Sequence, residues 1–334
     1  MPNPSSLTIQ NLLSQSIALD PERAATLAQT ADDAAEFLRA ARAAGTRSAY
    51  ASDWRQFAEW VQSHGLEPLP ADPRMIALWI SHMARQLGRR PATIRRMLAT
   101  IGTVHRMGNH PNPCQNQIVR EEMRGITNAL GARPKRAAPI LIAHLEAIVA
   151  ALPPGLRGAR DKAVLLVGWS GALRRSEIAA LAFMDQGARV LIQRSKTDQA
   201  GEGAYVALFH AARKALCPVQ ALQDWIRAAA LDSGPLFRRL TRHREPTVLG
   251  ESISGPDVLT ILERWTRLAG IQPEQRGDTF SPHSLRAGFI TEAARASKAE
   301  WQIAKQSRHK SATVLRTYIR IADTFQGNAG EGLL

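Results

Sequence analysis

The chain has 334 residues, of which 45% are hydrophobic, and this is long enough to bury the cores of two domains. No apolar run approaches the roughly 18 residues that indicate a membrane-spanning helix, and residues 1–16 lack the cationic start and apolar segment of a secretory signal. The two cysteines, Cys114 and Cys217, lie far apart without metal-binding or redox spacing, which favours free thiols in a cytoplasmic protein.

The formal net charge of +14 is spread unevenly along the chain. Residues 1–88 contain 7 arginines against 9 acidic residues, residues 89–131 contain 7 basic against 2 acidic residues, and residues 132–334 contain 29 against 18. A basic surface that displaces counterions from phosphates binds nucleic acid with strongly salt-dependent affinity. The charge therefore predicts a nucleic-acid partner; a solvated basic surface without a partner is the alternative.

The N-terminal third predicts an arm followed by a helical domain. Residues 1–33 are expected to form a partly ordered arm, and residues 34–131 a compact all-helical unit, because apolar residues there recur at helical spacing between start and stop signals. Asp72 followed by Pro73, for example, is a cap residue followed by a first helical position. The four predicted helices begin at Thr46, Asp72, Pro91 and about Gln115.

Basic residues near the end of this unit are candidates for DNA contact. Four arginines around the third helix are predicted to face outward, where they can lie along a DNA groove: Arg89, Arg90, Arg95 and Arg96. The segment 132–139 has two prolines and no apolar periodicity, so it is expected to be an interdomain linker. Its three cations can also touch backbone phosphates: Arg133, Lys135 and Arg136.

Residues 140–320 are expected to form a second, α-rich domain, and residues 321–334 a C-terminal tail. Strands are predicted only at 188–193 and 205–208, paired as a small antiparallel sheet with Lys196 at the tip of the turn between them. Helical segments are predicted at 141–151, 160–168, 217–230, 254–269, 282–296, 298–307 and 312–325. The expected fold class is mainly α.

Residues 281–320 combine side chains suited to phosphate chemistry: His283, Arg286, His309 and Tyr318. If Ser281 is a helix cap and Pro282 the first helical residue, His283 and Arg286 share a helix face, which makes an acid–base group the neighbour of a fixed cation. Histidine, arginine and a tyrosine hydroxyl without a carboxylate cluster suit a phosphodiester better than a sugar or a peptide.

Tyr318 is the candidate nucleophile among the three tyrosines. Tyr50 lies on an apolar helical stripe and Tyr205 begins a strand, whereas Arg316 and Arg320 stand beside Tyr318. Neighbouring positive charge favours the phenolate and so lowers the pKa of a phenol. A half-buried structural tyrosine is the alternative.

Arg174 and Glu177, three residues apart after Gly171, allow two interpretations. They can form a purely structural ion pair, or Glu177 can orient catalytic groups while Arg174 uses its remaining donors on a phosphate. Arg175 is a rival for this role, but the spacing to Glu177 favours Arg174. Taken alone, a residue such as His283 is more often a structural histidine, and one such as Lys196 more often a solvated turn residue.

Together these residues resemble the tyrosine recombinases, also called the phage integrase family, and the two-domain layout is similar to that of Cre-type recombinases. Six motif positions occur in the family's order: Arg174 in Leu173-Arg-Arg-Ser-Glu-Ile178, Lys196 in Arg-Ser-Lys-Thr, His283 and Arg286 in Pro-His-Ser-Leu-Arg-Ala-Gly, His309, and Tyr318 in Thr-Tyr-Ile-Arg. Glu177 fills the family's acidic position. The resemblance covers residues 160–325 strongly and residues 34–131, as a core-binding domain, more loosely.

Two features depart from the family pattern. Many members have a glycine directly before the histidine, whereas this chain has Gln306-Ser-Arg-His. The conformation of this turn is therefore not implied by the resemblance. The tail after Tyr318 is brief, with few large apolar residues to dock onto a neighbouring protomer as the family's tail does.

The resemblance implies a site-specific DNA recombinase that works as a homotetramer on double-stranded DNA with an inverted-repeat site. Tyr318 would attack a DNA phosphate to give a 3′-phosphotyrosine and a free 5′-hydroxyl. Because this linkage conserves the bond energy, neither a metal nor another cofactor is implied. The remaining roles that the resemblance implies are phosphate binding by Arg174, Arg286 and His309, proton acceptance by His283, protonation of the leaving oxygen by Lys196, and support by Glu177.

Two other functions remain compatible with the sequence. A type IB topoisomerase or a telomere resolvase shares the chemistry without pairing two sites, although the compact N-terminal helical unit and the tail favour recombination. A sequence-specific DNA-binding protein without catalysis would use the same basic helices. Replacing Tyr318 separates this last class from the enzymes.

Overall fold

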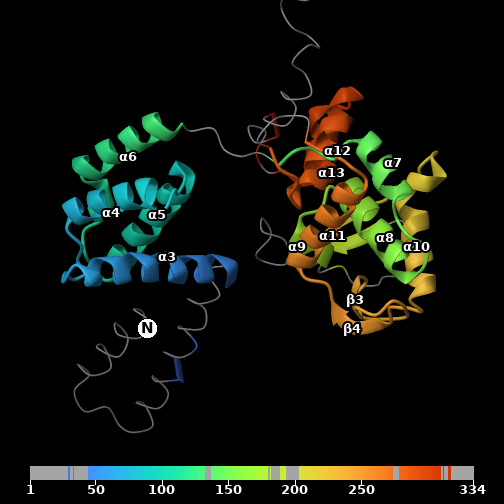
Figure 1. Cartoon of the computed structure of the whole chain (residues 1–334), viewed down its shortest axis with the longest axis horizontal. Coiled ribbons are helices and arrows are strands. Elements are labelled where there is room, and N and C mark those ends of the chain that lie inside the picture. The colour runs from blue at the N-terminus through green and yellow to red at the C-terminus, as the bar shows by residue number, and fades with distance from the viewer. Residues whose placement is uncertain are drawn as a thin grey trace, which may run out of the picture. The chain divides into compact units, whose positions relative to one another are not determined.

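A computed structural model describes residues 29–30, 33, 44–131, 137–179, 181, 189–192, 203–273, 278–309, 311 and 315–316. The chain divides into two compact units, 1–134 and 135–334 (Figure 1). Several predicted features lie outside the described residues: Lys196, Tyr318, Arg133, Lys135, Arg136, the tail 321–334 and most of the arm 1–33.

The N-terminal unit consists of helices, as its sequence predicts. They are α3 (Ala44–Ser63), α4 (Pro73–Arg85), α5 (Pro91–Met107) and α6 (Gln117–Leu130), with a short 3-10 turn η1 (Pro113–Gln115) before α6. The predicted start of α4 is confirmed, because the side chain of Asp72 accepts a hydrogen bond from the Arg74 N–H and Pro73 is the first helical residue.

Apolar stripes on these helices meet in one core. Large side chains that are 0% or 1% exposed within it include Phe57, Trp79, Ile80, Ile94 and Met97. His105 of α5 is buried in this core. Its Nε2 accepts from the Ala71 N–H (2.9 Å), and its Nδ1 lies 2.8 Å from the Ile101 carbonyl oxygen. Burial lowers the pKa of His105, so this ring is a neutral structural histidine.

The C-terminal unit is built around α8 (Leu156–Ser170), in which every residue from 163 to 168 is buried. Helices α10 (Pro218–Ala228) and α12 (His283–Arg295) pack against α8 (Figure 1). The remaining helical elements are α7 (Ile142–Ala150), α9 (Arg175–Ala179), η2 (Lys214–Leu216), α11 (Gly255–Leu268) and α13 (Glu300–Ser307).

Among its described residues, this unit also contains two small antiparallel sheets. The predicted pair is confirmed as β1 (Arg189–Ile192) and β2 (Ala204–Ala207), with Arg189 opposite Ala207. A second pair, β3 (Arg238–Leu240) and β4 (Val248–Ser252), was not predicted. Its strands are short and largely polar, so they lack the alternating pattern of a half-buried strand. Tertiary contacts hold them instead, including the hydrogen bond from Ser252 Oγ to the Ala179 carbonyl (2.6 Å).

Helix α12 approaches the backbone of residues 138–140 unusually closely. A Cβ atom added to Gly288 would lie 1.9 Å from the Ile140 carbonyl oxygen, so only glycine allows this packing. The Ile140 N–H donates to the Ser284 carbonyl (3.0 Å), and Trp169 Nε1 of α8 donates to the Ile140 carbonyl (2.7 Å). These contacts position the first two turns of α12 against the end of α8.

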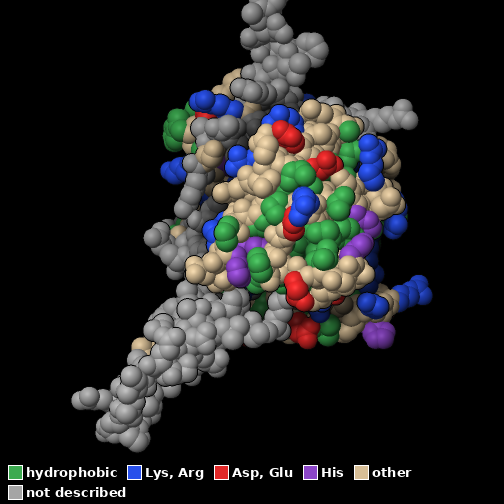
Figure 2. Space-filling view, turned by 90° about the vertical axis from the view of Figure 1, so that its left-hand side faces the viewer, with side chains coloured by type: hydrophobic (Ala, Val, Ile, Leu, Met, Phe, Trp, Pro, Cys, Tyr) green, Lys and Arg blue, Asp and Glu red, His purple; other side chains and the backbone are tan. Residues whose placement is uncertain are grey.

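Within the described part of the chain, no helix combines the length and the apolar character that crossing a bilayer requires. Figure 2 shows one face of the molecule, on which hydrophobic, basic, acidic and histidine side chains are mixed. Positive charge is therefore not concentrated on that face, even though the chain is basic as a whole.

Candidate active site

The site begins at the turn that follows α8. Gly171 ends that helix, Ala172 adopts a left-handed conformation with φ +46°, and Leu173 is buried. Arg174 then precedes α9, whose third residue is Glu177. The Glu177 carboxylate reaches back to accept from both the backbone N–H (2.8 Å) and Nη1 (2.6 Å) of Arg174, as a carboxylate in the first turn of a helix can.

Glu177 is ionised although it is only 1% exposed. Burial by itself would raise the pKa of this carboxyl, but the charge of Arg308 and the hydrogen bonds and charge of Arg174 outweigh burial and lower it. The structure thus contains the ion pair that the sequence suggested. Arg175, the rival arginine, is exposed, and Arg174 is the one that pairs with Glu177.

The second arginine comes from α12. Ser281 Oγ accepts from the His283 N–H (3.2 Å), as a cap side chain does, but α12 begins at His283, with Pro282 as its N-cap, one residue later than predicted. Arg286 is 3% exposed and its Nη1 donates to the Ala172 carbonyl (2.8 Å). His283 is exposed at the first helical position, so His283 and Arg286 differ in burial although they are one turn apart.

His309 joins the site from the end of α13. Its Nδ1 and Nε2 lie 3.3 and 3.4 Å from Arg286 Nη2, and Nδ1 also lies 2.7 Å from the buried Ser307 Oγ. Burial, followed by the positive charges of Arg286, Arg174 and Arg308, lowers the pKa of His309 to about 4. The imidazole is therefore neutral at physiological pH.

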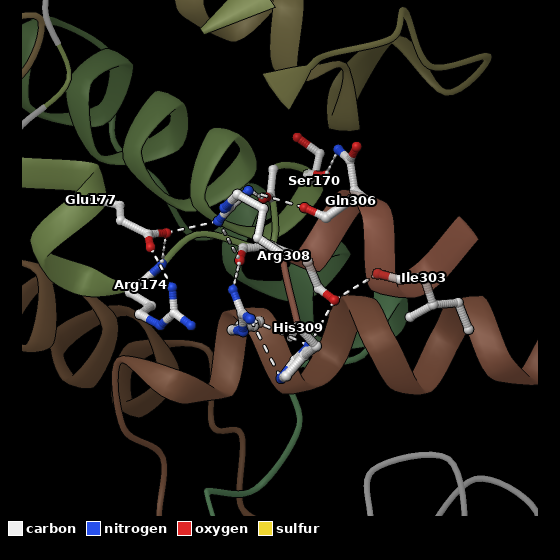
Figure 3. A network of polar contacts seen from close by, with 11 residues as sticks. Ser170, Arg174, Glu177, Ile303, Gln306, Arg308 and His309 are labelled. Carbon is white, nitrogen blue, oxygen red and sulfur yellow. Dashed lines mark hydrogen bonds and ion pairs between the residues drawn. The ribbon is translucent and has the colours of Figure 1, made fainter. Parts of the chain in front are cut away.

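The structure also brings in Arg308, which the sequence analysis did not select. Arg308 Nη2 donates to Glu177 Oε2 (2.7 Å) and to the Ala172 carbonyl (3.3 Å), as Figure 3 shows for the contact with Glu177. It ends α13 in the left-handed conformation, with φ +56°. The turn before His309 is therefore left-handed although position 308 is not a glycine. The absence of the family's glycine directly before His309 was the sequence signal that could have drawn attention to Arg308.

Four of the selected residues thus converge in one place: Arg174, Glu177, Arg286 and His309. They come from three segments that are far apart in sequence. Arg286 contacts His309 and the Ala172 carbonyl, and Arg308 links that carbonyl to the Glu177 carboxylate, which also binds Arg174. The arrangement presents guanidinium groups and a neutral imidazole on a buried carboxylate support, which suits an oxyanion such as a phosphate.

The four arginines predicted to contact DNA lie in the N-terminal unit, and all are exposed. Two of them make contacts within the chain: Arg96 forms an ion pair with the buried Asp53, and Arg95 Nη2 donates to Thr127 Oγ1 (2.8 Å). Among the residues that the structure describes, the guanidinium groups of Arg89 and Arg90 have no such partner. Arg89 and Arg96 line a hollow of about 270 Å³ between α3 and α5.

Comparison with known proteins identifies the family of the chain. The model of the Phage integrase family matches residues 142–324. The chain is 33% identical over 302 residues to an "Integrase/recombinase xerD homolog" of Selenomonas ruminantium, which covers 87% of this chain and 86% of the relative.

Two solved structures share the fold. The XerH site-specific recombinase bound to palindromic difH substrate superposes with a TM-score of 0.59 at 17% identity, over 96% of this chain and 86% of that chain. A lambda integrase dimer bound to a COC′ core site superposes with a TM-score of 0.59 at 16% identity, over 86% and 93%. Because the family model matches more than half of the chain and the curated relative is similar over most of its length, the chain belongs to the phage integrase family and is an enzyme of the tyrosine recombinase class.

Proposed function

We propose that the protein is a site-specific DNA recombinase that cuts and rejoins strands through a 3′-phosphotyrosine at Tyr318. The observation that carries the proposal is that Arg174, Arg286 and His309 lie in one hydrogen-bonded cluster, joined through Glu177, Arg308 and the Ala172 carbonyl. Two cations and a neutral hydrogen-bonding ring suit a phosphate on which negative charge grows during in-line attack. Residues 140–320 act as the catalytic domain and residues 34–131 as the core-binding domain.

Arg174 and Arg286 bind the non-bridging oxygens of the attacked phosphate. Glu177 engages Arg174 Nη1, and among the described residues Arg174 Nη2 has no hydrogen-bond partner, so this nitrogen is available to the phosphate. In the structure the Ser307 hydroxyl donates its single proton to the Ile303 carbonyl (2.6 Å), so Ser307 Oγ accepts from His309 Nδ1–H and Nε2 carries no proton. His309 adds a hydrogen bond to the phosphate from Nε2 once the Ser307 hydroxyl turns its proton to Nδ1, because a neutral imidazole carries one proton.

The proton transfers complete the reaction. The Tyr318 hydroxyl passes its proton to His283 as its oxygen bonds to phosphorus, and the bond from phosphorus to the 5′ oxygen breaks. Lys196 gives a proton to that leaving oxygen. A 5′-hydroxyl then reverses the step on the same or another strand, so rejoining needs no metal and no further energy source.

DNA is bound as double-stranded inverted repeats by a homotetramer in the cytoplasm. The palindromic substrate of XerH and the lambda integrase dimer on a core site support a paired arrangement. Arg89 and Arg90 contact phosphates with Arg95 and Arg96 beside them, and the linker contributes Arg133, Lys135 and Arg136. The tail 321–334 docks onto a neighbouring protomer.

Trapping the covalent adduct tests the proposal. Inverted repeats near the gene provide a nicked duplex in which the short released strand diffuses away, so cleavage cannot be reversed. The unmodified chain should form a denaturation-resistant DNA adduct, and Tyr318→Phe should bind the duplex without forming one. Tyr205→Phe, which alters an exposed strand residue, is the matched control and should react normally.

The outcomes separate the candidate functions. An adduct that persists in Tyr318→Phe would reject Tyr318 as the nucleophile. Absence of the adduct from the unmodified chain would reject the proposed cleavage reaction. Relaxation of a plasmid that lacks the repeats would instead favour a topoisomerase. Strand exchange that requires two sites supports recombination.

A further inference from the structure

Arg308 occupies a backbone position at which arginine is disfavoured. It ends α13 with φ +56° and ψ +43°, the left-handed conformation that glycine adopts most easily at the end of a helix. A residue with a Cβ atom is strained there, and such strain persists where the surroundings hold it in place. The side chain therefore gives the reason for arginine at this position.

Both terminal nitrogens of the Arg308 guanidinium are engaged by the protein. Nη1 donates to the carbonyl oxygens of Gly171 (3.2 Å) and Gln306 (3.0 Å), and Nη2 donates to Glu177 Oε2 (2.7 Å) and the Ala172 carbonyl (3.3 Å). Each terminal nitrogen has two protons, so both are satisfied. The side chain is 13% exposed, and its Nε is buried without a partner among the described residues. Arg308 has no terminal donor left for a DNA phosphate.

Arg308 shares its partners with the two phosphate-binding candidates. Glu177 accepts from Arg308 through Oε2 and from Arg174 through Oε1, and the Ala172 carbonyl accepts from both Arg308 and Arg286. Figure 3 shows Arg308 directed toward Glu177, with Arg174 on the same carboxylate and His309 directly after Arg308 in the chain. One side chain at the end of α13 thus connects residues 171 and 172 to α9, and it shares the Ala172 carbonyl with Arg286 of α12.

We propose that Arg308 is a positioning residue: by joining Glu177 to the carbonyls of residues 171 and 172, it holds Arg174 and Arg286 in the geometry that binds the DNA phosphate. This inference rests on the proposed function, because it assigns Arg308 to the same phosphate site. Arg308 does not touch the phosphate itself. A planar guanidinium suits this task because it spans a carboxylate and two backbone carbonyls simultaneously.

Two substitutions distinguish the effect of the left-handed backbone at position 308 from the effect of the guanidinium group. Arg308→Gly allows the left-handed turn but removes every side-chain contact, whereas Arg308→Lys keeps the positive charge and the same backbone strain but lacks the fork. Arg213→Ala, which removes one arginine of an exposed ion pair with Glu146, is the control for loss of a positive charge. All variants are full-length and are assayed on the nicked duplex that traps the unmodified chain.

The measurements are the affinity for the duplex, by fluorescence anisotropy, and the single-turnover rate of adduct formation. Arg308→Gly should bind the duplex within about twofold of the unmodified chain and react roughly 10- to 100-fold more slowly, as for other residues that orient a reacting site. Arg308→Lys should be intermediate, and Arg213→Ala should react normally. A merely structural role would not produce this separation of binding from cleavage.

A second substrate isolates the phosphate contacts. In a methylphosphonate, a methyl group replaces one non-bridging oxygen and the scissile group is neutral, so it depends less on two correctly placed cations. The defect of Arg308→Gly should therefore shrink on this substrate. An equal defect on both substrates, or a normal rate for Arg308→Gly or Arg308→Lys on the phosphate, would overturn the positioning role.

The failure of this inference differs from the failure of the proposed function. If the unmodified chain forms no adduct, both are rejected. If the unmodified chain forms the adduct and Arg308→Gly forms it equally fast, only the role of Arg308 is rejected. If Arg308→Gly does not fold, the rate for Arg308→Lys on the two substrates decides the question.

Discussion

The buried carboxylate of Glu177 should be the main electrostatic support of the site, and Glu177→Gln tests this. The side chain is 0% exposed and accepts from two guanidinium groups, those of Arg174 and Arg308. Glutamine has nearly the same shape, but it loses the charge and turns an N–H₂ group toward guanidinium donors. Removing one partner of a buried ion pair typically costs about 3–5 kcal/mol, because the remaining charge stays buried without compensation.

This cost predicts a large and localised loss of thermal stability. In a unit of this size, 1 kcal/mol corresponds to roughly 2–4 °C, so the Tm of the C-terminal unit should fall by on the order of 10 °C. Differential scanning calorimetry of the full chain measures the loss, which should be confined to the transition of that unit. Glu146→Gln is the matched control, because its pair with Arg213 is exposed and an exposed pair contributes only about 0–1 kcal/mol.

The pH dependence of stability provides a second test of the Glu177 carboxylate. The folded-state pKa of Glu177 is lowered, so its contribution should be fully present above about pH 4.5 and should disappear as the pH falls through the lowered value. The gap between the unmodified chain and Glu177→Gln should close accordingly. A Glu177→Gln protein as stable at pH 7 as Glu146→Gln would refute the view that this carboxylate supports the site.

Three further predictions concern other parts of the chain. The pKa of His309 is lowered to about 4, so as the pH falls from about 6.5 to 4 the unfolded chain takes up a proton that the folded chain does not. The free energy of unfolding should therefore fall by on the order of 1 kcal/mol per pH unit in this range. His309→Asn should lack this component of the pH-dependent denaturation profile. Gly288→Ala should destabilise the C-terminal unit by roughly 1–3 kcal/mol in urea denaturation, because its Cβ would overlap the Ile140 carbonyl, whereas Gly125→Ala, in open space on α6, should be neutral or stabilising. Arg89→Ala should weaken DNA binding and reduce the slope of log affinity against log salt concentration by about one unit. Arg96→Ala should mainly lower the Tm, because it leaves Asp53 buried without its charge partner. Equal slopes for Arg89→Ala and the unmodified chain would contradict the phosphate contact assigned to Arg89.

Much of the architecture followed from local signals in the sequence. Caps and apolar spacing predicted α4 with its first residue and α12 with a start one residue early, because a helix start depends on neighbours a few positions away. The pair β1 and β2 was predicted for the same reason, since two apolar runs flank one polar turn. The strands β3 and β4 escaped prediction because their stability comes from α9 and from residues beyond the hairpin.

In the candidate site, too, some features followed from local sequence patterns and others only from long-range packing. The order of the motifs identified Arg174, Glu177, Arg286 and His309 and the family to which the chain belongs, because each motif is a short local pattern. The tertiary structure alone decided that Arg96 is held by Asp53 and that Arg308 shares Glu177 with Arg174. Glu177 and Arg308 are 131 residues apart, and their hydrogen bond exists only because α8, α9 and α13 pack at one place. Local spacing determines which side chains a helix presents, whereas the long-range packing of separate helices determines which of those side chains meet.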